Sequence, residues 1–439
     1  MSIITAILVL SFLIIVHEIG HFAAAKLLGV RVLEFSLFMG PRLLSIKKGE
    51  TRYSLKLIPI GGSCLLEGEN ESSDDDKALN NKPRWVRAVI FIAGPFMNLA
   101  IAFIMVLILN FYIGYTSCEI AYIAENSPVA AATVPTPLAV GDEIISYAGK
   151  RINVPTEVFI YMHDTKGAPA SVEFKRGGEV LKTTITPIFT AGKRYILGFT
   201  TMQASGPDWN IIESVTAGDP AEALGMQPGD KILTIAGKAP DSIEELRSIL
   251  AESSGGEVDV TWSTSGGDMV SGRTAPKLTN DQDNYSIGVA FAQVASPGLL
   301  DGIVFAYYTS ISYSKMVLYS LKWMVTGAIG LGQASGPVGI VADISAGVEE
   351  ASKQPEGVKV VITYLLSLSA LIGINLGLFN LIPFPPLDGS KLLLLGVEAV
   401  RRKDIPQERQ MAITMFGFVV LILIMVLTLF NDIFRIINK

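Results

Sequence analysis

Five consecutive residues near the N-terminus have the types and the spacing of a metal site. They read His17-Glu18-Ile19-Gly20-His21 and lie in a long apolar stretch that is predicted to be helical. Because residues four apart share one face of an α-helix, the imidazoles of His17 and His21 could bind the same metal ion. Glu18 stands beside them and could take a proton from an attacking water molecule. The pattern therefore indicates hydrolysis that depends on a metal ion.

A catalytic zinc ion needs a third protein ligand and one open position for water. The one remaining histidine, His163, belongs to a region far along the chain, and we interpret it as structural. Asp388 is the only acidic residue within the third of the apolar segments described below, and it follows a proline-rich turn, Pro383–Pro386. We predict one zinc ion bound by His17, His21 and Asp388. The alternative for Asp388 is a helix cap after the turn.

Two asparagines, Asn375 and Asn380, precede that turn. A substrate that crosses a membrane arrives as a helix whose peptide groups are bonded internally, so it must be unwound before a peptide bond can be hydrolysed. Asparagine side chains can offer competing hydrogen bonds to an unwound backbone. We predict that Asn375 and Asn380 bind substrate, and the alternative is packing between helices.

The chain around these residues is too apolar for a soluble protein. Of its 439 residues, 50% are hydrophobic and 17% are charged, whereas about 25% charged residues is usual. A membrane-spanning helix needs about 20 apolar residues. Four segments meet this requirement, at residues 3–28, 88–115, 358–397 and 411–431. Ionisable residues at membrane depth are costly and therefore indicate function, and the alternative is a polar cluster that joins helices.

Three other interpretations of the sequence are disfavoured: a signal peptide, a nucleic-acid-binding protein and a metal transporter. A signal peptide at the N-terminus would carry Lys or Arg before its apolar stretch, and none is present there. The net charge of −6 leaves no basic surface for nucleic acid. A metal transporter would need further acidic or histidine residues along a path across the bilayer, and the apolar segments supply none.

The positive charges predict how the chain is oriented. Lys and Arg residues gather between the first and second segments and between the third and fourth, and such clusters stay on the cytoplasmic side. Residues 116–357 and both termini then face outward. In a bacterial inner membrane, this places the outer region in the periplasm and the active site towards the cytoplasmic side. Cys64 and Cys118 fall on opposite sides, so they cannot form a disulfide.

The outer region contains an internal repeat. Ten residues that begin with Gly141-Asp142 recur from Gly229-Asp230, and a stretch of small residues precedes each copy. A short helix, a Gly-Asp turn and then a strand resemble the bacterial PDZ domain, which binds peptides by adding a strand to a sheet edge. We predict two PDZ-like α+β domains, the first irregular because Val134–Pro137 is inserted before its turn. The alternative is two β-rich spacers that bind no peptide.

The remaining segments complete the predicted fold class, a multi-pass α-helical membrane protein with four transmembrane helices. Residues 31–87 predict a membrane-associated β-hairpin or sheet and then a solvated, flexible acidic loop from Glu67 to Lys82. An edge strand of this sheet could pair with an extended substrate, and the alternative is a surface hairpin without substrate contact. Residues Leu299 to Thr326 predict an amphipathic helix. The predicted divisions are 1–30, 31–87, 88–115, 116–205 and 206–296 (the PDZ-like domains), 297–357 (amphipathic helix and linker), 358–397, 398–410 (cytoplasmic loop) and 411–439.

Together, these motifs resemble the site-2 protease family of intramembrane zinc metalloproteases. The resemblance rests on His17–His21 in the first span, Gly94-Pro95-Phe96-Met97-Asn98 in the second, and the run from Asn380 to Gly389 in the third. It extends nearly from end to end. The tandem outer domains bring it closest to the family's bacterial regulators of sigma-E.

The resemblance implies zinc bound by His17, His21 and Asp388, with Glu18 as the general base. It implies substrates that are single-pass membrane proteins, cut in or near the transmembrane segment during the envelope stress response. The implied substrates are an anti-sigma factor that a first protease has already trimmed, and remnant signal peptides. The outer domains would exclude untrimmed substrates by size. The cytoplasmic-side hairpin around Leu55 to Cys64, with Gly61 and Gly62 as substrate-binding residues, would hold the substrate strand. Further partners are membrane lipid and peptide or protein ligands of the PDZ-like domains.

Two departures from the family pattern leave the substrate preference open. Ser390 and Lys391 stand where the family usually has Gly-His, and Ser63 and Cys64 stand where it usually has Tyr-Val. One alternative function is a related protease for a different regulator or a pheromone. Another is a non-catalytic PDZ scaffold that retains a metal for structure.

Overall fold

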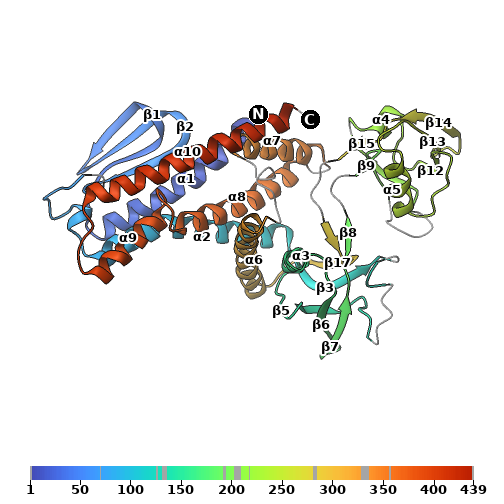
Figure 1. Ribbon diagram of the computed structural model, residues 1–439, viewed down its shortest axis with the longest axis horizontal. Coiled ribbons are helices and arrows are strands. Elements are labelled where there is room, and N and C mark those ends of the chain that lie inside the picture. Colours follow the sequence, from blue (N-terminus) through green and yellow to red (C-terminus); the bar gives the residue numbers. More distant parts are fainter. Residues whose placement is uncertain are drawn as a thin grey trace. The chain divides into compact units, whose positions relative to one another are not determined.

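The chain forms two compact units, one made of Met1–Tyr115 with Val294–Lys439 and the other of Thr116–Gln293. The computed structural model describes residues 2–69, 71–124, 127–130, 136–190, 194–201, 209–216, 218–279, 284–327, 336–354 and 357–437. The first unit is helical apart from one sheet, and the second is built mainly of short strands (Figure 1).

In the first unit, four helices of the described residues are long and apolar enough to cross a membrane, as predicted. They are α1 (Ser2–Leu27), α2 (Arg84–Ile113), α8 (Gly357–Leu381) and α10 (Gln407–Ile437). The third predicted segment is not one helix, because α8 ends at Leu381 and α9 (Asp388–Arg401) begins after the prolines. Proline has no N–H and its ring clashes with the preceding turn, so the helix cannot continue through Pro383–Pro386. Asp388 is therefore the first residue of a new helix.

Glycines let the helices of this unit approach closely. A Cβ at Gly20 of α1 would overlap the carbonyl group of Ala93 in α2, and a Cβ at Gly377 of α8 would lie 2.9 Å from the Leu99 side chain of α2. Helix α2 therefore contacts both α1 and α8. Buried apolar residues fill the contact between α2, α8 and α6 (Leu299–Val325), among them Met105, Val106, Ala306 and Ala370.

The sheet of the first unit consists of β1 (Val32–Lys48) and β2 (Thr51–Leu66). Residues 32–37 of β1 pair with residues 62–66 of β2 on one side and with residues 52–55 on the other, and residues 42–48 pair with 51–56. Residues 62–66 have strand partners on one side only, so they form an edge strand. The Ser11 hydroxyl of α1 donates to the Pro59 carbonyl at 2.8 Å and faces the Gly61 N–H at 3.4 Å. The part of β2 just before the edge strand is thereby tied to α1.

The acidic loop after β2 is less solvated than predicted. Glu67 and Asp75 both bind the Arg31 guanidinium, at 2.7 and 2.6 Å. Leu79 begins a short 3-10 helix, η1 (Leu79–Asn81), and is buried together with Ala78. Part of the charge of this loop is therefore paired within the protein.

The second unit repeats one succession of elements. In each copy, a strand that follows a Gly-Asp turn leads to a helix and then to a β-hairpin. The first copy holds β4 (Glu143–Tyr147), β5 (Lys150–Arg151), α3 (Pro155–Asp164), β6 (Ala170–Arg176) and β7 (Glu179–Ile185); the second holds α4 (Pro220–Ala223), β12 (Lys231–Ile235), α5 (Ile243–Glu252), β13 (Val258–Ser263) and β14 (Met269–Thr274).

The two Gly-Asp turns also share their hydrogen bonds. Asp142 and Asp230 are both buried, and each carboxylate accepts the backbone N–H of the residue three positions earlier. These residues are Ala139 and Gln227. The sequence repeat is therefore a repeat in three dimensions. The small-residue stretch and the insertion predicted before the first turn, residues 126–131 and 134–137, lie only partly among the described residues.

The remaining strands of the second unit form one larger sheet and three short pairs. One sheet has the order β17-β3-β4-β6-β7, so β17 (Val289–Val294) pairs with β3 (Tyr115–Ile123). Three further pairs bring together β8 (Ile188–Thr190) with β16 (Asn284–Ser286), β9 (Tyr195–Ile196) with β15 (Lys277–Leu278), and β10 (Phe199–Thr201) with β11 (Ile212–Val215).

In the first unit, Asp432 ties the end of α10 to the start of α7 (Pro337–Lys353). It is fully buried, and its two carboxylate oxygens accept the backbone N–H groups of Gly336 at 3.0 Å and Gly339 at 2.7 Å. N–H groups in the first turn have no partner within their own helix, and a helix N-terminus carries partial positive charge. The Asp432 carboxylate, which belongs to another helix, therefore accepts hydrogen bonds from two N–H groups at the start of α7.

We expect Asp432→Asn to lower the thermal unfolding midpoint of the protein in detergent. The amide loses the charge and one acceptor, and a buried N–H without a partner costs about 1–3 kcal/mol. Asp404→Asn is the matched control, because Asp404 is 75% exposed where it pairs with Arg84, and such surface pairs contribute about 0–1 kcal/mol. Equal shifts in the two variants would contradict the capping role of Asp432.

Candidate active site

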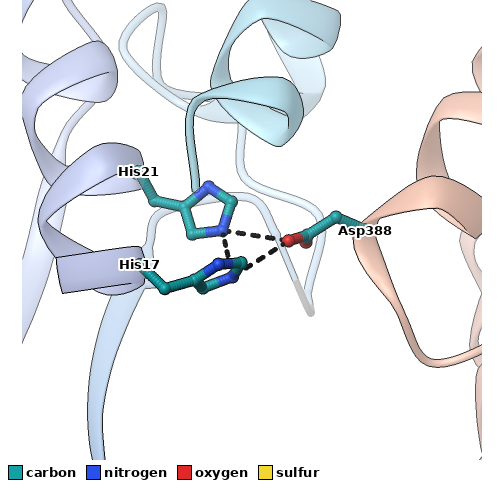
Figure 2. A group of neighbouring side chains, drawn as sticks. All are labelled: His17, His21 and Asp388. Atoms are coloured by element: carbon teal, nitrogen blue, oxygen red, sulfur yellow. Dashed lines mark hydrogen bonds and ion pairs between the residues drawn. The ribbon is translucent and has the colours of Figure 1, made fainter. Parts of the chain in front are cut away.

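Three side chains from distant parts of the chain converge on one point. The Nε2 atoms of His17 and His21 lie 3.2 Å apart, and Oδ2 of Asp388 lies 3.1 Å from the first and 3.2 Å from the second. Figure 2 shows both imidazoles facing the Asp388 carboxylate. Each side chain is only 10–12% exposed. The structure thus brings together the three residues that were predicted as metal ligands.

The spacing of these atoms fits a zinc ion. Zinc takes nitrogen and oxygen ligands at about 2.0–2.1 Å in a tetrahedral arrangement, so its ligand atoms lie about 3.3 Å from one another. The three observed separations, 3.1–3.2 Å, are close to that value. Two imidazoles and one carboxylate are also a donor set that zinc accepts, with a fourth position left open.

Helix α2 shapes the space that the imidazoles occupy. A Cβ at Gly94 would lie 2.7 Å from Cε1 of His21 and 2.8 Å from Cε1 of His17, which is closer than van der Waals contact. Only glycine leaves room at this position. One turn earlier in α2, the Ile90 carbonyl oxygen lies 2.8 Å from Nδ1 of His21 and accepts its hydrogen, so that Nε2 faces Asp388.

The proline turn determines where the Asp388 carboxylate can reach. Asp388 is the first residue of α9, Leu387 is the N-cap, and no side chain makes a capping hydrogen bond there. The carboxylate instead points to the two histidines. The alternative role of Asp388 as a helix cap is therefore not what the structure shows.

A cavity of about 390 Å³ opens onto the three side chains. Glu18 lines this cavity, and so do four consecutive residues of the β2 edge strand, Ser63 to Leu66. The backbone N–H of Cys64 donates a hydrogen bond to the Glu18 carboxylate. The proton acceptor, the three converging side chains and an edge strand thus share one cavity.

Lys391 brings a positive charge to the same cavity. Its ammonium group lies 2.7 Å from the Glu69 carboxylate, 3.8 Å from Oδ1 of Asp388 and 5.1 Å from the centre of the Phe91 ring. The neighbouring departure from the family pattern, Ser390, is buried, and its hydroxyl donates to the Leu387 carbonyl at 2.7 Å. Lys391 therefore connects α9 to the loop that follows β2.

Glu34 is the other acidic group of the cavity wall. Paired hydrogen bonds from the Arg42 guanidinium, at 3.0 and 2.6 Å, lower the pKa of Glu34 to about 2. Glu34 is therefore ionised at neutral pH, and Arg42 compensates its charge.

Some of the other predicted site residues lie close to this cavity, and others do not line it. Gly62 is close, since a Cβ there would lie 3.7 Å from Cγ of Glu18. Gly61 is buried beside α1, where a Cβ would lie 3.4 Å from the Ile14 side chain. Asn375 and Asn380 are half-buried on α8 and do not line the cavity. In the other unit, the His163 ring packs edge-on against Tyr285.

Four charged residues that line the cavity have no predicted role from the sequence: Glu34, Lys56, Glu69 and Lys391. Lys391 offered a signal because it departs from the family pattern. Glu69 offered none, since its partner lies 322 residues away and only the folded chain joins them.

The profile of peptidase family M50 matches residues 5–424. The chain belongs to this family. It is 27% identical to the zinc metalloprotease RasP of Shouchella clausii over 435 residues, which cover 97% of each chain. It is also 27% identical to the regulator of sigma-W protease RasP of Bacillus subtilis over 450 residues, which cover 99% of this chain and 98% of the relative. This M50 peptidase is thus a zinc metalloprotease of the site-2 protease type, and the predicted zinc dependence is confirmed.

Gly94→Ala should make this M50 peptidase lose zinc. The added methyl group would displace both imidazoles, and misplaced ligand support costs about 10–100-fold in metal affinity. Metal analysis of the purified protein after dialysis against a chelator measures the effect. Gly396→Ala on α9 is the control, because a Cβ there meets nothing within 4 Å. Unchanged zinc content in Gly94→Ala would show that α2 does not constrain the imidazoles.

Proposed function

We propose that this M50 peptidase holds zinc with His17, His21 and Asp388 and cleaves single-pass membrane proteins in or near their transmembrane segment. The observation that carries the proposal is the convergence of the three ligand atoms within 3.2 Å of one another, in a unit whose helices are apolar enough to span a membrane. Charged and polar side chains at membrane depth are costly, so their convergence there supports catalysis rather than packing.

Zinc, when bound, supplies a Lewis acid that polarises the scissile carbonyl and acidifies water. Glu18 is not one of the converging side chains, yet it lines the same cavity next to them. Its carboxylate takes the proton of the attacking water and then passes it to the leaving amine. The Cys64 N–H keeps that carboxylate turned towards the cavity.

The edge strand of β2 is the proposed docking site for the substrate backbone. The outer edge of residues 62–66 has no strand partner among the described residues, and Ser63 to Leu66 line the cavity that contains the converging side chains. An extended substrate segment that pairs with this edge forms hydrogen bonds between its own peptide groups and the strand. Without such pairing, the interior of a membrane would leave these peptide groups unbonded. Asn375 and Asn380 on α8 are proposed to hold the unwound part of the substrate farther from the cavity.

The second unit is proposed to form two PDZ-like domains on the outer side of a bacterial membrane, where they obstruct substrates that have not been trimmed. In the second copy, a cavity of about 330 Å³ lies between the strand residues 195–201 and α5, with Ile243, Leu246 and Leu250 in its wall. A cleft between a strand and a helix is where a PDZ domain would accept an added strand. The name of the Bacillus subtilis relative, a regulator of sigma-W protease, supports a trimmed anti-sigma factor as the substrate class, with remnant signal peptides as a second.

Glu18→Gln should abolish cleavage while the protein keeps its zinc. The amide cannot take a proton, and losing a general base costs about 10²–10⁴-fold in rate, whereas the three ligands remain. Asp388→Asn should lose both cleavage and zinc. The assay uses membranes with a tagged single-pass substrate in two forms, one with a short outer segment and one with a folded outer domain, and only the short form should be cut by the wild type.

The outcomes separate the candidate functions. Substantial cleavage by Glu18→Gln would contradict its role as the general base. Cleavage of both substrate forms at equal rates would contradict size exclusion by the outer domains. If the wild type cuts no member of a panel of short substrates, including signal peptides and pheromone precursors, a non-catalytic scaffold replaces the protease.

Cys64 allows the docking of the substrate strand to be tested directly. The chain has two cysteines, so Cys118→Ser in a Glu18→Gln background leaves Cys64 alone in the uncut complex. Single cysteines placed along the substrate segment should form disulfides with Cys64 at alternate positions, because successive side chains of a strand point to opposite faces. Burial raises the pKa of the Cys64 thiol, so an oxidising catalyst is required.

Crosslinks at every third or fourth substrate position would show that the segment remains helical and would contradict strand pairing. Cys64→Ser should remove every crosslink, which controls for disulfides formed between substrate molecules.

A further inference from the structure

The two imidazoles of the site differ in the group that faces Nδ1, the ring nitrogen that does not face Asp388. Nδ1 of His21 faces the Ile90 carbonyl oxygen, which can only accept a hydrogen bond, so this nitrogen carries the proton and Nε2 is free for a metal. Nδ1 of His17 instead lies 3.3 Å from Nδ2 of the Asn98 side chain. An amide presents either a donor or an acceptor, so the contact alone does not decide which nitrogen of His17 carries the proton.

Asn98 lies on α2, one turn beyond Gly94, and is fully buried. With Nδ2 facing His17, Nδ1 has to accept the hydrogen bond, and the proton of the neutral ring then resides on Nε2. Such a ring donates to Asp388 and has no electron pair at Nε2 for a metal. In this arrangement Oδ1 of Asn98 is buried and has no hydrogen-bond partner among the residues that the structure describes, which costs about 1–3 kcal/mol. An Asn98 amide with Nδ2 towards His17 therefore does not suit a His17 that binds a metal through Nε2.

We infer that Asn98 is a positioning residue whose Oδ1 accepts the Nδ1 hydrogen of His17 when zinc is bound. A half-turn of the amide exchanges its oxygen and nitrogen with almost no change in shape. Oδ1 then gains a partner, while Nδ2 moves to the position that Oδ1 now occupies. Both histidines reach the same state, with Nδ1–H bonded to an oxygen and Nε2 turned to the metal. Such outer hydrogen bonds fix the ring and raise the basicity of the ligand. The inference rests on the proposed role of His17 as a zinc ligand.

The test measures how readily zinc leaves the full-length protein in detergent for a chromogenic chelator. Asn98→Leu keeps the approximate volume but offers no acceptor, and zinc should leave about 10–100-fold more readily. Asn98→Asp offers only acceptors and should hold zinc at least as well as the wild type. A role in packing alone predicts the opposite order, because a leucine suits an apolar interior better than a carboxylate does.

Asn110→Leu is the matched control for the loss of a buried hydrogen bond. Asn110 is on the same helix, is buried, and donates to the Gly302 carbonyl at 3.1 Å, away from the site. Its variant should hold zinc as the wild type does.

His17→Ala separates this inference from the proposed function. If His17→Ala holds zinc as the wild type does, the ligand set itself is wrong. If His17→Ala loses zinc but Asn98→Leu holds it like the wild type, the role of Asn98 is overturned while the ligand set stands. Asn98→Asp losing zinc as readily as Asn98→Leu, or Asn110→Leu losing it to the same extent, would equally overturn the role of Asn98.

Discussion

Three electron-pair donors held about 3 Å apart repel one another unless a cation or a proton lies between them, and low polarity strengthens that repulsion. In this M50 peptidase the donors come from α1 and α9, which are 367 residues apart in the chain at His21 and Asp388. The rest of the first unit can be understood as the frame that keeps them together. Gly20 and Gly94 let α2 press against α1 and the imidazoles, and the proline turn starts α9 where its first carboxylate meets them. Each of these features lowers the local stability of a helix and helps to position a proposed ligand.

A second constraint is that peptide groups inside a membrane must be bonded within the protein. The irregular backbone near the site respects it. The part of β2 just before its edge strand is tied to α1 through Ser11, and the Cys64 N–H of the edge strand donates to Glu18. Glu398, which is 1% exposed, accepts a hydrogen bond from Arg87 at 3.2 Å and one from the Ile405 backbone at 3.0 Å, where α9 turns towards α10. These polar groups thus serve either the site or a junction between helices.

Much of this arrangement could be predicted from the sequence, because the decisive signals are local. Apolar length predicts the four spans, helical spacing places His17 above His21, and Asp388 is found because acids inside apolar segments are so few. The prolines also predict where the third segment breaks. What could not be predicted depends on partners that only folding brings together. The pair Lys391–Glu69 joins residues 322 apart, and the role of Asp432 depends on the start of α7 lying beside the end of α10. The acidic loop was judged by its composition, although Arg31 neutralises part of it.

The position of Cys64 has a consequence for selective inhibition. Its thiol lies in the wall of the cavity that holds the proposed zinc ligands, at a place where related proteases usually carry a residue that does not react with electrophiles. A zinc-chelating compound bound in this cavity would hold a weakly electrophilic arm next to the sulfur for as long as it stays bound. Because burial keeps the thiol protonated, free reagents would react slowly, and the chelating group would provide the selectivity by proximity. Covalent capture would then distinguish this enzyme from relatives that bind the same chelator reversibly.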